Sequence, residues 1–520
     1  MRLHDYLDKG ASLGADRPCL TTDGTSMSYA DVVGLSRDVA AALVARGLGA
    51  GGRVAIVSAN DPVAFTCVFG ISRAGGVWCP INSRNEAAEN QELLELFGAE
   101  VVIYQSVFSP LVAAIRDALP DVHTWVCLDA VDDRSLSFDY FVSLGASSDV
   151  PALPERPALV ERPGADELAM LVGTGGTTGR PKGVMLTPTN LETMTALTLM
   201  GYPFDGPPVY LALAPLTHAA GVLCFPVLSL GGEVVIMRAP DVGGFLSLVA
   251  EHRVTHTFLP PTLIYMVLGS PALDSTDLSS LQCFWYGAAP MSASRLEEAL
   301  TRIGPVMAQL FGQTEAPMMI SMMPPADHFL PDGSVAVGRL TSAGRPSPLV
   351  TVAILDSSDQ PVPPGERGEI CARSSLVMAG YWKNPTETAS TLANGWLHTG
   401  DIGFLDEEGF LHIVDRAKDM IITGGFNVYS TEVEQAVLAH EAVQDCAVIG
   451  LPDEKWGERV VVVVQPHPGA TVHPVELIAF VKARIGSVKA PKEVHVWDDL
   501  PRSKVGKVLK TEIKGSLTSS

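Results

Sequence analysis

Short apolar runs alternate with longer stretches of helical periodicity over most of this 520-residue chain. The runs have the length and β-branched content of buried strands. They lie at residues 54–59, 101–105, 124–128 and 234–237. Between them, residues 35–48 and 87–98 carry apolar side chains at the spacing of amphipathic helices. This alternation predicts an α/β fold with largely parallel sheets.

The pattern changes at three later places. The Pro-rich residues 151–164 predict a linker between two α/β subdomains. Residues 350–413 contain short strands separated by turn clusters, which predicts a small β-rich subdomain. A compact α/β tail is expected after Asp415, and in it residues 430–440 have the pattern of an amphipathic helix with Ser430 as its N-cap.

Composition narrows the classes of partner. The formal net charge of -22 disfavours a broad nucleic-acid surface or an anionic membrane surface. The most apolar stretch, residues 221–230, is broken by Pro226 and falls far short of the ~20 residues that span a bilayer. The N-terminus has no apolar secretory core, and the eight cysteines lack metal-binding spacing. We therefore expect a cytoplasmic protein with free thiols, no membrane span and no nucleic-acid partner.

One segment has the composition of an anion-binding loop. Residues 174–183 read TGGTTGRPKG and follow an apolar run, so the loop is expected to leave the end of a strand. Glycines allow backbone N–H groups to converge, threonines add hydroxyl donors, and Lys182 adds a positive charge. The spacing fits neither a Walker loop nor a dinucleotide-binding fingerprint. The segment predicts a phosphate site of another kind.

This segment resembles the signature loop T-S-G-T-T-G-x-P-K-G of the adenylate-forming superfamily, which contains acyl-CoA synthetases, nonribosomal-peptide adenylation domains and beetle luciferases. It departs from that loop once, with Gly175 in place of serine. Further segments resemble the family in the same order along the chain. They are PINSR at 80–84, PLTH at 215–218, GAAP at 287–290, FGQTE at 311–315, WLHTGD at 396–401, DRAKDMIITGGFN at 415–427 and PRSKVGK at 501–507.

The resemblance implies an ATP site and assigns its residues. The loop residues that should hold the β- and γ-phosphates are Thr174, Gly175, Gly176, Thr177, Thr178, Gly179 and Lys182. The segments that should enclose adenine and contact the α-phosphate contain Gly287, Ala288, Ala289, Phe311, Gly312 and Thr314. Asp401 should bind the ribose hydroxyls with help from Arg416, and Glu315 should ligate Mg²⁺. Lys507 should bridge the attacking carboxylate and the α-phosphate.

The resemblance also implies a second half-reaction with coenzyme A. It divides the chain into a large N-terminal adenylation domain at 1–414, a hinge at 415–418 and a mobile C-terminal domain at 419–520 that carries the catalytic lysine. Lys418 matches the hinge residue. The loop expected to line the pantetheine channel contains Gly424, Gly425 and Phe426. The expected acyl pocket contains His218, Gly221, Trp285, Tyr286 and Gln313, and His218 should also gate the channel.

The predicted function is an ATP-dependent acyl-CoA synthetase that activates an apolar monocarboxylic acid as acyl-AMP and transfers the acyl group to coenzyme A. An acyl-AMP ligase that loads a carrier protein is an alternative. A third interpretation is an enzyme weak in adenylation, because the Gly175 departure removes a hydroxyl from the phosphate loop. An amino-acid-adenylating enzyme is disfavoured, since PLTHAAG at 215–221 lacks an acidic residue to hold an ammonium group.

Overall fold

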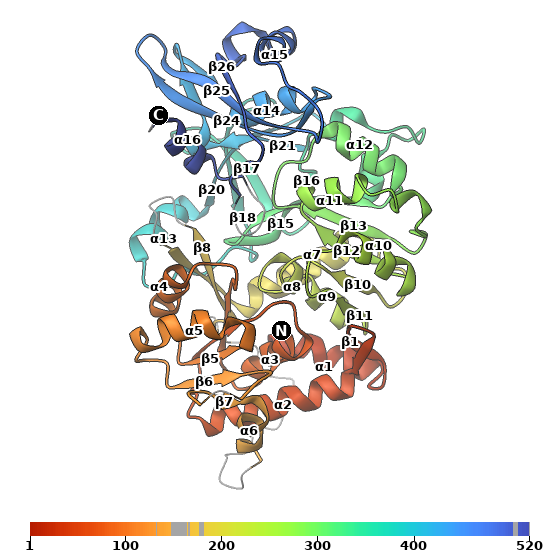
Figure 1. Ribbon diagram of the computed structural model, residues 1–520, viewed down its shortest axis with the longest axis vertical. Helices are drawn as coiled ribbons and strands as arrows, with labels where there is room; N and C mark the ends of the chain where they lie inside the picture. Colours follow the sequence, from red (N-terminus) through yellow and green to blue (C-terminus); the bar gives the residue numbers. More distant parts are fainter. Residues whose placement is uncertain (132, 147–163, 165–166, 176–180, 503–507, 519–520) are drawn as a thin grey trace.

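The computed structural model describes residues 1–131, 133–146, 164, 167–175, 181–502 and 508–518. Two large sheets form the body of the N-terminal part, and a smaller domain, blue in Figure 1, covers one end. The Pro-rich linker predicted at 151–164 lies outside the described residues except for Gly164.

The first sheet has the strand order β19-β9-β8-β4-β3-β5-β6-β7. Its strands are β3 (Arg53–Val57), β4 (Val77–Ile81), β5 (Val101–Tyr104), β6 (Thr124–Cys127), β7 (Leu136–Ser137), β8 (Met170–Gly175), β9 (Pro181–Leu186) and β19 (Gly380–Tyr381). Strands β3 to β8 pair in parallel, whereas β9 is antiparallel to both of its neighbours. The associated helices are α1 (Leu3–Leu13), α2 (Tyr29–Ala45), α3 (Pro62–Arg73), α4 (Ala87–Phe97), α5 (Ser109–Ile115), α6 (Phe138–Leu144), α7 (Pro188–Gly201) and α13 (Pro385–Thr391).

The second sheet has the order β16-β15-β14-β13-β12-β10-β11-β1-β2. Its strands are β1 (Pro18–Thr22), β2 (Thr25–Ser28), β10 (Val209–Ala212), β11 (Glu233–Ile236), β12 (His256–Leu259), β13 (Cys283–Gly287), β14 (Met307–Gln313), β15 (Ala316–Met323) and β16 (Arg345–Pro346). The central strands β11, β10, β12, β13 and β14 pair in parallel. Its helices are α8 (Ala219–Val222), α9 (Cys224–Ser229), α10 (Val242–Glu251), α11 (Pro261–Leu268) and α12 (Ala293–Arg302).

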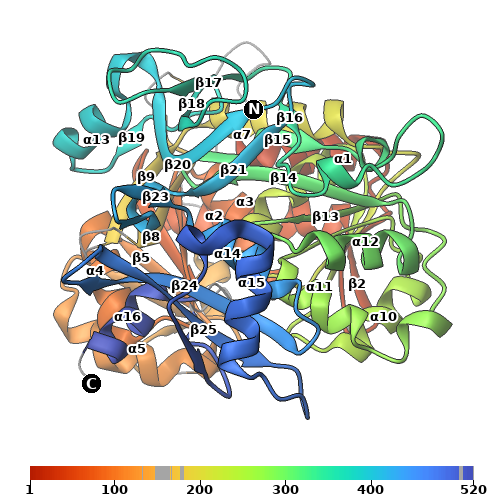
Figure 2. The same cartoon turned by 90° about the horizontal axis from the view of Figure 1, so that it is seen from above.

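A small antiparallel sheet and the C-terminal domain complete the chain. The small sheet is β17 (Thr351–Leu355), β18 (Gly368–Arg373), β20 (Leu397–Leu405) and β21 (Leu411–Arg416). The C-terminal domain contains β22 (Ile421–Thr423), β23 (Phe426–Val428), α14 (Ser430–Leu438), β24 (Val443–Asp453), β25 (Gly457–Pro466), α15 (Pro474–Lys489), β26 (Glu493–Val496) and α16 (Lys510–Thr518). Figure 2 shows this domain from above, over the other sheets.

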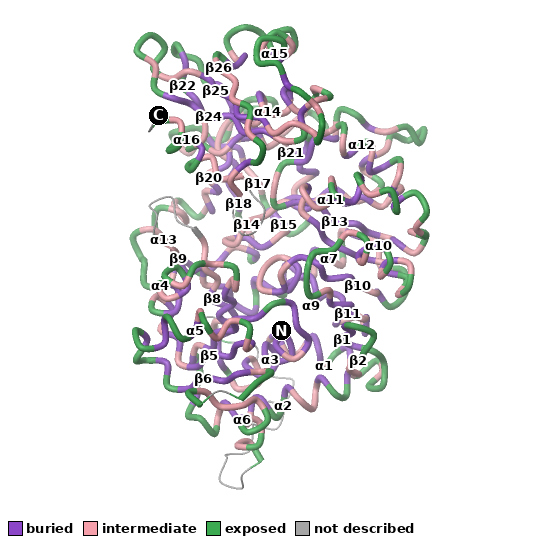
Figure 3. Tube along the Cα trace, in the orientation of Figure 1, coloured by how far each residue is buried: buried purple, intermediate pink, exposed green. Residues whose placement is uncertain are grey.

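The predicted architecture is confirmed: the chain contains two α/β subdomains, a β-rich subdomain and a small α/β domain, although β1 and β2 join the second sheet and β19 joins the first. Buried residues concentrate along the strands of the large sheets, and exposed residues lie on the outer helices and turns (Figure 3). Six of the eight cysteines lie in strands, and all eight are buried and free, as expected. The strands are apolar and enclosed by helices, which explains why buried residues concentrate along them and why the cysteines in them are buried.

The expected N-cap role of Ser430 is wrong. Helix α14 begins at Ser430 itself, and Tyr429 occupies the cap position without a side-chain cap bond. The backbone N–H and hydroxyl of Ser430 donate instead to the carboxylate of Asp415, the hydroxyl over 2.9 Å. Asp415 lies near the end of β21, on the other side of the predicted hinge residue Lys418, and accepts hydrogen bonds from the first residue of the helix. The pattern of residues 430–440 alone does not reveal this contact.

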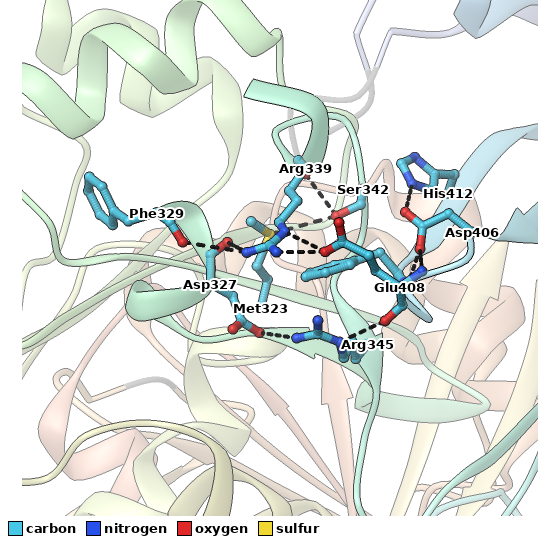
Figure 4. Close-up of polar contacts among 10 residues, drawn as sticks. Met323, Asp327, Phe329, Arg339, Ser342, Arg345, Asp406, Glu408 and His412 are labelled. Atoms are coloured by element: carbon cyan, nitrogen blue, oxygen red, sulfur yellow. Dashed lines mark hydrogen bonds and ion pairs between the residues drawn. The ribbon is translucent and has the colours of Figure 1, made fainter. Parts of the chain in front are cut away.

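A polar cluster attaches the β20–β21 turn to the second sheet (Figure 4). The Arg339 guanidinium pairs with Glu408 at 2.6 Å, and Arg345 pairs with Asp327 at 3.3 Å. Both guanidinium groups also lie over the ring of Phe410, Arg345 at 3.9 Å from its centroid. These contacts hold the hairpin that carries Asp401 and Arg416 against the N-terminal body.

Candidate functional site

Asp401 and Arg416 face one another across the β20–β21 pair. Their Cα positions are register partners, and Arg416 Nε lies 2.7 Å from Asp401 Oδ1. Asp401 is only 4% exposed, whereas the Arg416 side chain is 43% exposed. A buried carboxylate held by a partly exposed guanidinium is a suitable acceptor for sugar hydroxyls, which donate hydrogen bonds. The structure therefore brings these two predicted nucleotide residues together.

A second set of contacts, which the sequence analysis missed, orients the turn before Asp401. Glu369 Oε1 accepts a hydrogen bond from the Gly400 N–H at 2.9 Å, and Oε2 lies 2.9 Å from His398 Nδ1. The Thr399 hydroxyl donates to the Ile370 carbonyl at 2.6 Å. Glu369 and His398 are 29 residues apart, so their pairing depends on the β18–β20 register.

Glu315, Tyr381 and Lys182 form a continuous set of contacts. Thr314 and Glu315 lie in the turn between β14 and β15, and Glu315 is half-buried. The Tyr381 hydroxyl donates to Glu315 Oε1 at 2.7 Å, and Lys182 Nζ lies 5.0 Å from the centroid of the Tyr381 ring. The Tyr381 pKa is raised, because burial and the nearby Glu315 carboxylate both disfavour the phenolate.

Lys182 also forms an ion pair with Glu387 in the first turn of α13. Thr174 and Lys182 are register partners on β8 and β9, so the predicted phosphate loop is the connection of this hairpin. Strand β19 joins β9 and places Tyr381 opposite Val184. Lys182 in this structure therefore lies between an acid and an aromatic ring.

The predicted adenine segments have closely packed backbones. A Cβ added at Gly287 would lie 2.4 Å from the Leu310 carbonyl oxygen, and one at Gly312 would lie 2.4 Å from the Met318 nitrogen. Ala288 has φ of 65°, which is unusual for a residue other than glycine, and Ala289 beside it is half-buried. Phe311 is also half-buried and packs against the core. Such strained, closely packed backbone occurs most often at ligand sites.

The expected acyl-pocket residues do not share one face. Side chains alternate along β13, so Trp285 packs in the core cluster with Tyr210 and Ala308, whereas Tyr286 packs in a separate cluster. The Tyr286 hydroxyl lies 2.9 Å from His328 Nε2. The two side chains therefore face opposite sides of the sheet, and the grouping of both in one acyl pocket stays a prediction.

The remaining pocket residues surround the ends of β10 and β14. His218 precedes α8 and is half-buried, with Nδ1 2.9 Å from the Thr217 hydroxyl. Gly221 is tightly packed, because an added Cβ would lie 1.9 Å from the Leu216 carbonyl oxygen. Gln313 is half-buried at the end of β14.

The predicted coenzyme A residues lie on the surface. Lys418, Gly424, Gly425 and Phe426 are exposed, and the Phe426 side chain is 60% exposed. Gly424 has φ of 58°, and a Cβ there would lie 2.7 Å from the Trp456 ring. The hairpin therefore requires glycine at this position.

The loop residues Gly176 to Gly179 and the predicted catalytic Lys507 lie outside the described residues.

The C-terminal domain contacts the N-terminal part through charged groups. Arg295 Nη2 of α12 lies 3.1 Å from His467 Nε2, and the pKa of His467 is lowered by burial and by the Arg295 charge. The Arg367 guanidinium lies 4.6 Å from the centroid of the Tyr429 ring.

Two family models match this chain. The model of the AMP-binding enzyme family matches residues 7–382, and the model of the AMP-binding enzyme C-terminal domain matches residues 432–507. The chain belongs to the AMP-binding enzyme family. The predicted membership of the adenylate-forming acyl-CoA synthetases and the predicted ligase activity are confirmed.

Curated relatives of this AMP-binding enzyme include the medium/long-chain-fatty-acid–CoA ligase FadD8 of Mycobacterium tuberculosis. That protein is 35% identical over 96% of this chain and 87% of its own length. A feruloyl-CoA synthase from an Amycolatopsis species is 36% identical over 94% of both chains. The solved structure of the amide bond synthetase McbA from Marinactinospora thermotolerans is 29% identical, with a TM-score of 0.88 over 99% of this chain and all of that one.

Within the described ranges, no helix of this AMP-binding enzyme combines the length and apolar content that crossing a bilayer requires.

Proposed function

We propose that this chain couples ATP to the activation of a carboxylic acid and transfers the resulting acyl group to coenzyme A. The main observation behind the proposal is a contact between the β8–β9 hairpin, which carries Lys182, and Glu315, the predicted metal ligand. Tyr381 touches both Lys182 and Glu315, although these two residues are more than 130 positions apart in the chain. A nucleotide with its Mg²⁺ would need a cation beside the phosphate oxygens and a carboxylate beside the metal, and this contact brings the two together.

In the first step the acid's carboxylate oxygen attacks the α-phosphorus of ATP, the bond to the β-phosphate breaks, and pyrophosphate leaves. Asp401 and Arg416 would hold the ribose, and Thr174 and Lys182 would hold the leaving phosphates. Lys507 would neutralise charge between the carboxylate and the α-phosphate. Positioning and charge stabilisation provide most of the rate increase in such a transfer.

Glu315 fits a magnesium role chemically. Its carboxylate oxygens are the hard ligands that Mg²⁺ prefers, and the Tyr381 hydroxyl fixes the orientation of Oε1. The ion would neutralise phosphate charge when bound. Lys182 would exchange Glu387 for a phosphate oxygen when ATP enters, because both partners are anions competing for one ammonium group.

In the second step the thiol of coenzyme A attacks the acyl carbon and AMP leaves. The surface position of Gly424, Gly425 and Phe426 supports a rotation at Lys418 between the two steps, which would bring this hairpin against the N-terminal domain. A carrier-protein thiol is a second candidate acceptor, because the same exposed hairpin is open to a tethered thiol.

Acid-dependent exchange of pyrophosphate into ATP tests the first step, and thioester formation from acyl-adenylate tests the second. Glu315→Gln should lower the exchange by roughly 10²-fold, since a charge-stabilising ligand typically contributes that much. The second step should persist in this variant. Equal loss of both steps, or exchange that needs no acid, would contradict the proposal.

A further inference from the structure

Asp415 connects the end of β21 to the C-terminal domain. Its carboxylate accepts hydrogen bonds from the backbone N–H and the hydroxyl of Ser430, the first residue of α14, the hydroxyl over 2.9 Å. Lys510 Nζ of α16 in turn donates to the Ser430 hydroxyl oxygen at 2.5 Å and pairs with Glu434 of α14 at 2.7 Å. A chain of hydrogen bonds therefore runs from the last helix through Ser430 to β21.

These groups are shielded from water. Asp415 is 3% exposed and Ser430 is 0% exposed. Burial raises the pKa of Asp415, and the charge of Lys510 opposes that rise and favours the carboxylate. A hydrogen bond to a buried carboxylate is stronger than the same bond in water, because no solvent competes for either group. Asp415 therefore holds the start of α14 more firmly than an exposed side chain would.

A second contact holds the start of the same helix. Arg367, directly before β18, places its guanidinium 4.6 Å from the centroid of the Tyr429 ring, and its Nη2 lies 3.9 Å from Glu432 Oε2. The Arg367 side chain is 40% exposed, so this contact is the weaker of the two. We call the contacts that Asp415 and Arg367 make with residues 429–432 the helix anchor.

Strand β21 itself is fixed to the N-terminal part at both of its ends. It pairs with β20 along its length, and the turn between the two strands is held by the ion pair of Arg339 with Glu408 (Figure 4). At the other end, Arg416 pairs with Asp401 of β20. Strand β21 therefore cannot follow the C-terminal domain if that domain moves.

The helix anchor lies next to the exposed hairpin in the chain. Strand β23 ends at Val428, two residues before Ser430, and the Phe426 side chain is 60% exposed. Fixing Ser430 thus keeps the hairpin in its exposed position. Asp415 and Ser430 lie on opposite sides of Lys418 in the chain. A rotation centred on Lys418 would separate them, because β21 would stay behind.

We propose that Asp415 and Ser430 are positioning residues that hold the C-terminal domain in the orientation with an exposed hairpin, and that their hydrogen bonds break before the thiol attacks. This inference rests on the proposed function and adds the contact that sets the balance between its two half-reactions. A contact that stayed intact through both steps would instead make Ser430 a purely structural residue.

The experiment measures both half-reactions in Ser430→Ala, with dodecanoate and benzoate as the fatty and aryl probe acids. Pyrophosphate exchange reports the first step, and thioester formation from synthetic acyl-adenylate reports the second. The variant keeps the helix N–H but loses the hydroxyl between Asp415 and Lys510. The ratio of the second rate to the first should rise by roughly tenfold, the lower end of the contribution of a hydrogen bond to a charged group. Arg367→Ala should raise the same ratio by less, because its contact is more exposed.

Thr431→Ala is the matched control. It removes a hydroxyl from the same helical turn, and within the described ranges no hydrogen bond links the Thr431 side chain to Asp415 or Lys510. It should leave the ratio unchanged. Trypsin cleavage after the exposed Lys418 gives a readout that needs no activity, and it should be several-fold faster in Ser430→Ala than in the control. Thermal unfolding monitors folding, and Arg367→Ala keeps the test decisive where Ser430→Ala does not fold.

Two results would overturn the inference while the proposed function stands. One is a Ser430→Ala variant in which both half-reactions change by the same factor, since a purely structural role predicts this. The other is trypsin cleavage of that variant at the rate of the control. Absence of acid-dependent exchange in the wild type with both probe acids would count against the proposed function, and the cleavage rates would still decide whether the helix anchor holds the domain.

Discussion

The proposed nucleotide side and the proposed coenzyme A side of this enzyme are built differently. On the nucleotide side, Asp401 is buried and paired with Arg416, and Glu315 is oriented by Tyr381. On the coenzyme A side, Gly424 to Phe426 form an exposed hairpin, and Lys418 is exposed as well. The first set is held in place by contacts within the chain, whereas the second would reach the acyl group only through the proposed rotation.

Because of this difference, mutations on the two sides should affect different half-reactions. Residues that are already held in place should affect the rate of the step in which they touch the phosphates. Residues on the exposed hairpin or at the proposed hinge should affect the second step alone, because in the proposed mechanism they would contribute only after the domain rotates.

Lys507→Ala should have the largest effect. Loss of a positive charge at the α-phosphate typically lowers the rate by ~10²–10³-fold, so acid-dependent pyrophosphate exchange should fall at least that far. Transfer to coenzyme A from supplied acyl-adenylate should survive. Lys504→Ala, in the same terminal motif, is the control and should retain exchange. Parallel loss of both half-reactions in Lys507→Ala would contradict the assigned role.

Lys418→Pro should affect the opposite step. Proline restricts φ to about -65°, which would hinder a rotation centred on this residue. Exchange should continue, and thioester formation should fall by roughly tenfold or more if closure of the domain limits that step. Lys418→Ala keeps the backbone free and serves as the control. A normal rate of transfer in the proline variant would remove Lys418 from the hinge.

Gly175→Ser tests whether the departure in the phosphate loop matters. A restored hydroxyl could add a hydrogen bond to a charged phosphate, which is typically worth ~1.5–3 kcal/mol, or roughly 10- to 150-fold at most. We expect a several-fold gain in exchange and no change in acyl transfer. Brisk exchange in the wild type that does not respond to serine would show that the departure is silent.

The smallest expected effect is a pH dependence of the contact between domains. The lowered pKa of His467 means that the ring is neutral near pH 7 and sits beside Arg295. The contact is fully present above the unperturbed pKa of about 6.5 and weakens as pH falls through the lowered value, because protonation places two positive charges together. His467→Gln should remove this dependence, measured as limited proteolysis at the hinge between pH 7 and pH 5. An identical pH profile in the variant would exclude His467.

Much of the fold follows from local patterns. The apolar runs predict β3, β5, β6 and β11 to within two residues at either end, because buried parallel strands need continuous apolar sequence. Helices α2 and α4 follow from their periodicity. The contacts that hold the site do not follow in this way. Lys182 and Glu387 are 205 residues apart, and only the pairing of β19 with β9 brings them together.

One feature of the expected acyl pocket could have been predicted from the sequence. Trp285 and Tyr286 are neighbours in a strand, so the two-residue period requires them to face opposite sides. What packs against Trp285 does not follow from the strand alone, because its neighbours Tyr202 and Phe204 come from the segment after α7. Glu369 and His398 had no local signal either, since a β18–β20 register pairs them.

Product analysis of one reaction tests the central claim most directly. The chain is incubated with ATP, Mg²⁺, coenzyme A and each member of a panel of fatty and aryl carboxylic acids, and nucleotides and thioester are quantified together. We predict that AMP and pyrophosphate form in step with the acyl-CoA thioester of an accepted acid, and that omission of coenzyme A leaves acyl-AMP bound to the protein. Formation of ADP and phosphate, or AMP without any thioester in the presence of coenzyme A, would contradict an acyl-CoA synthetase built on this site.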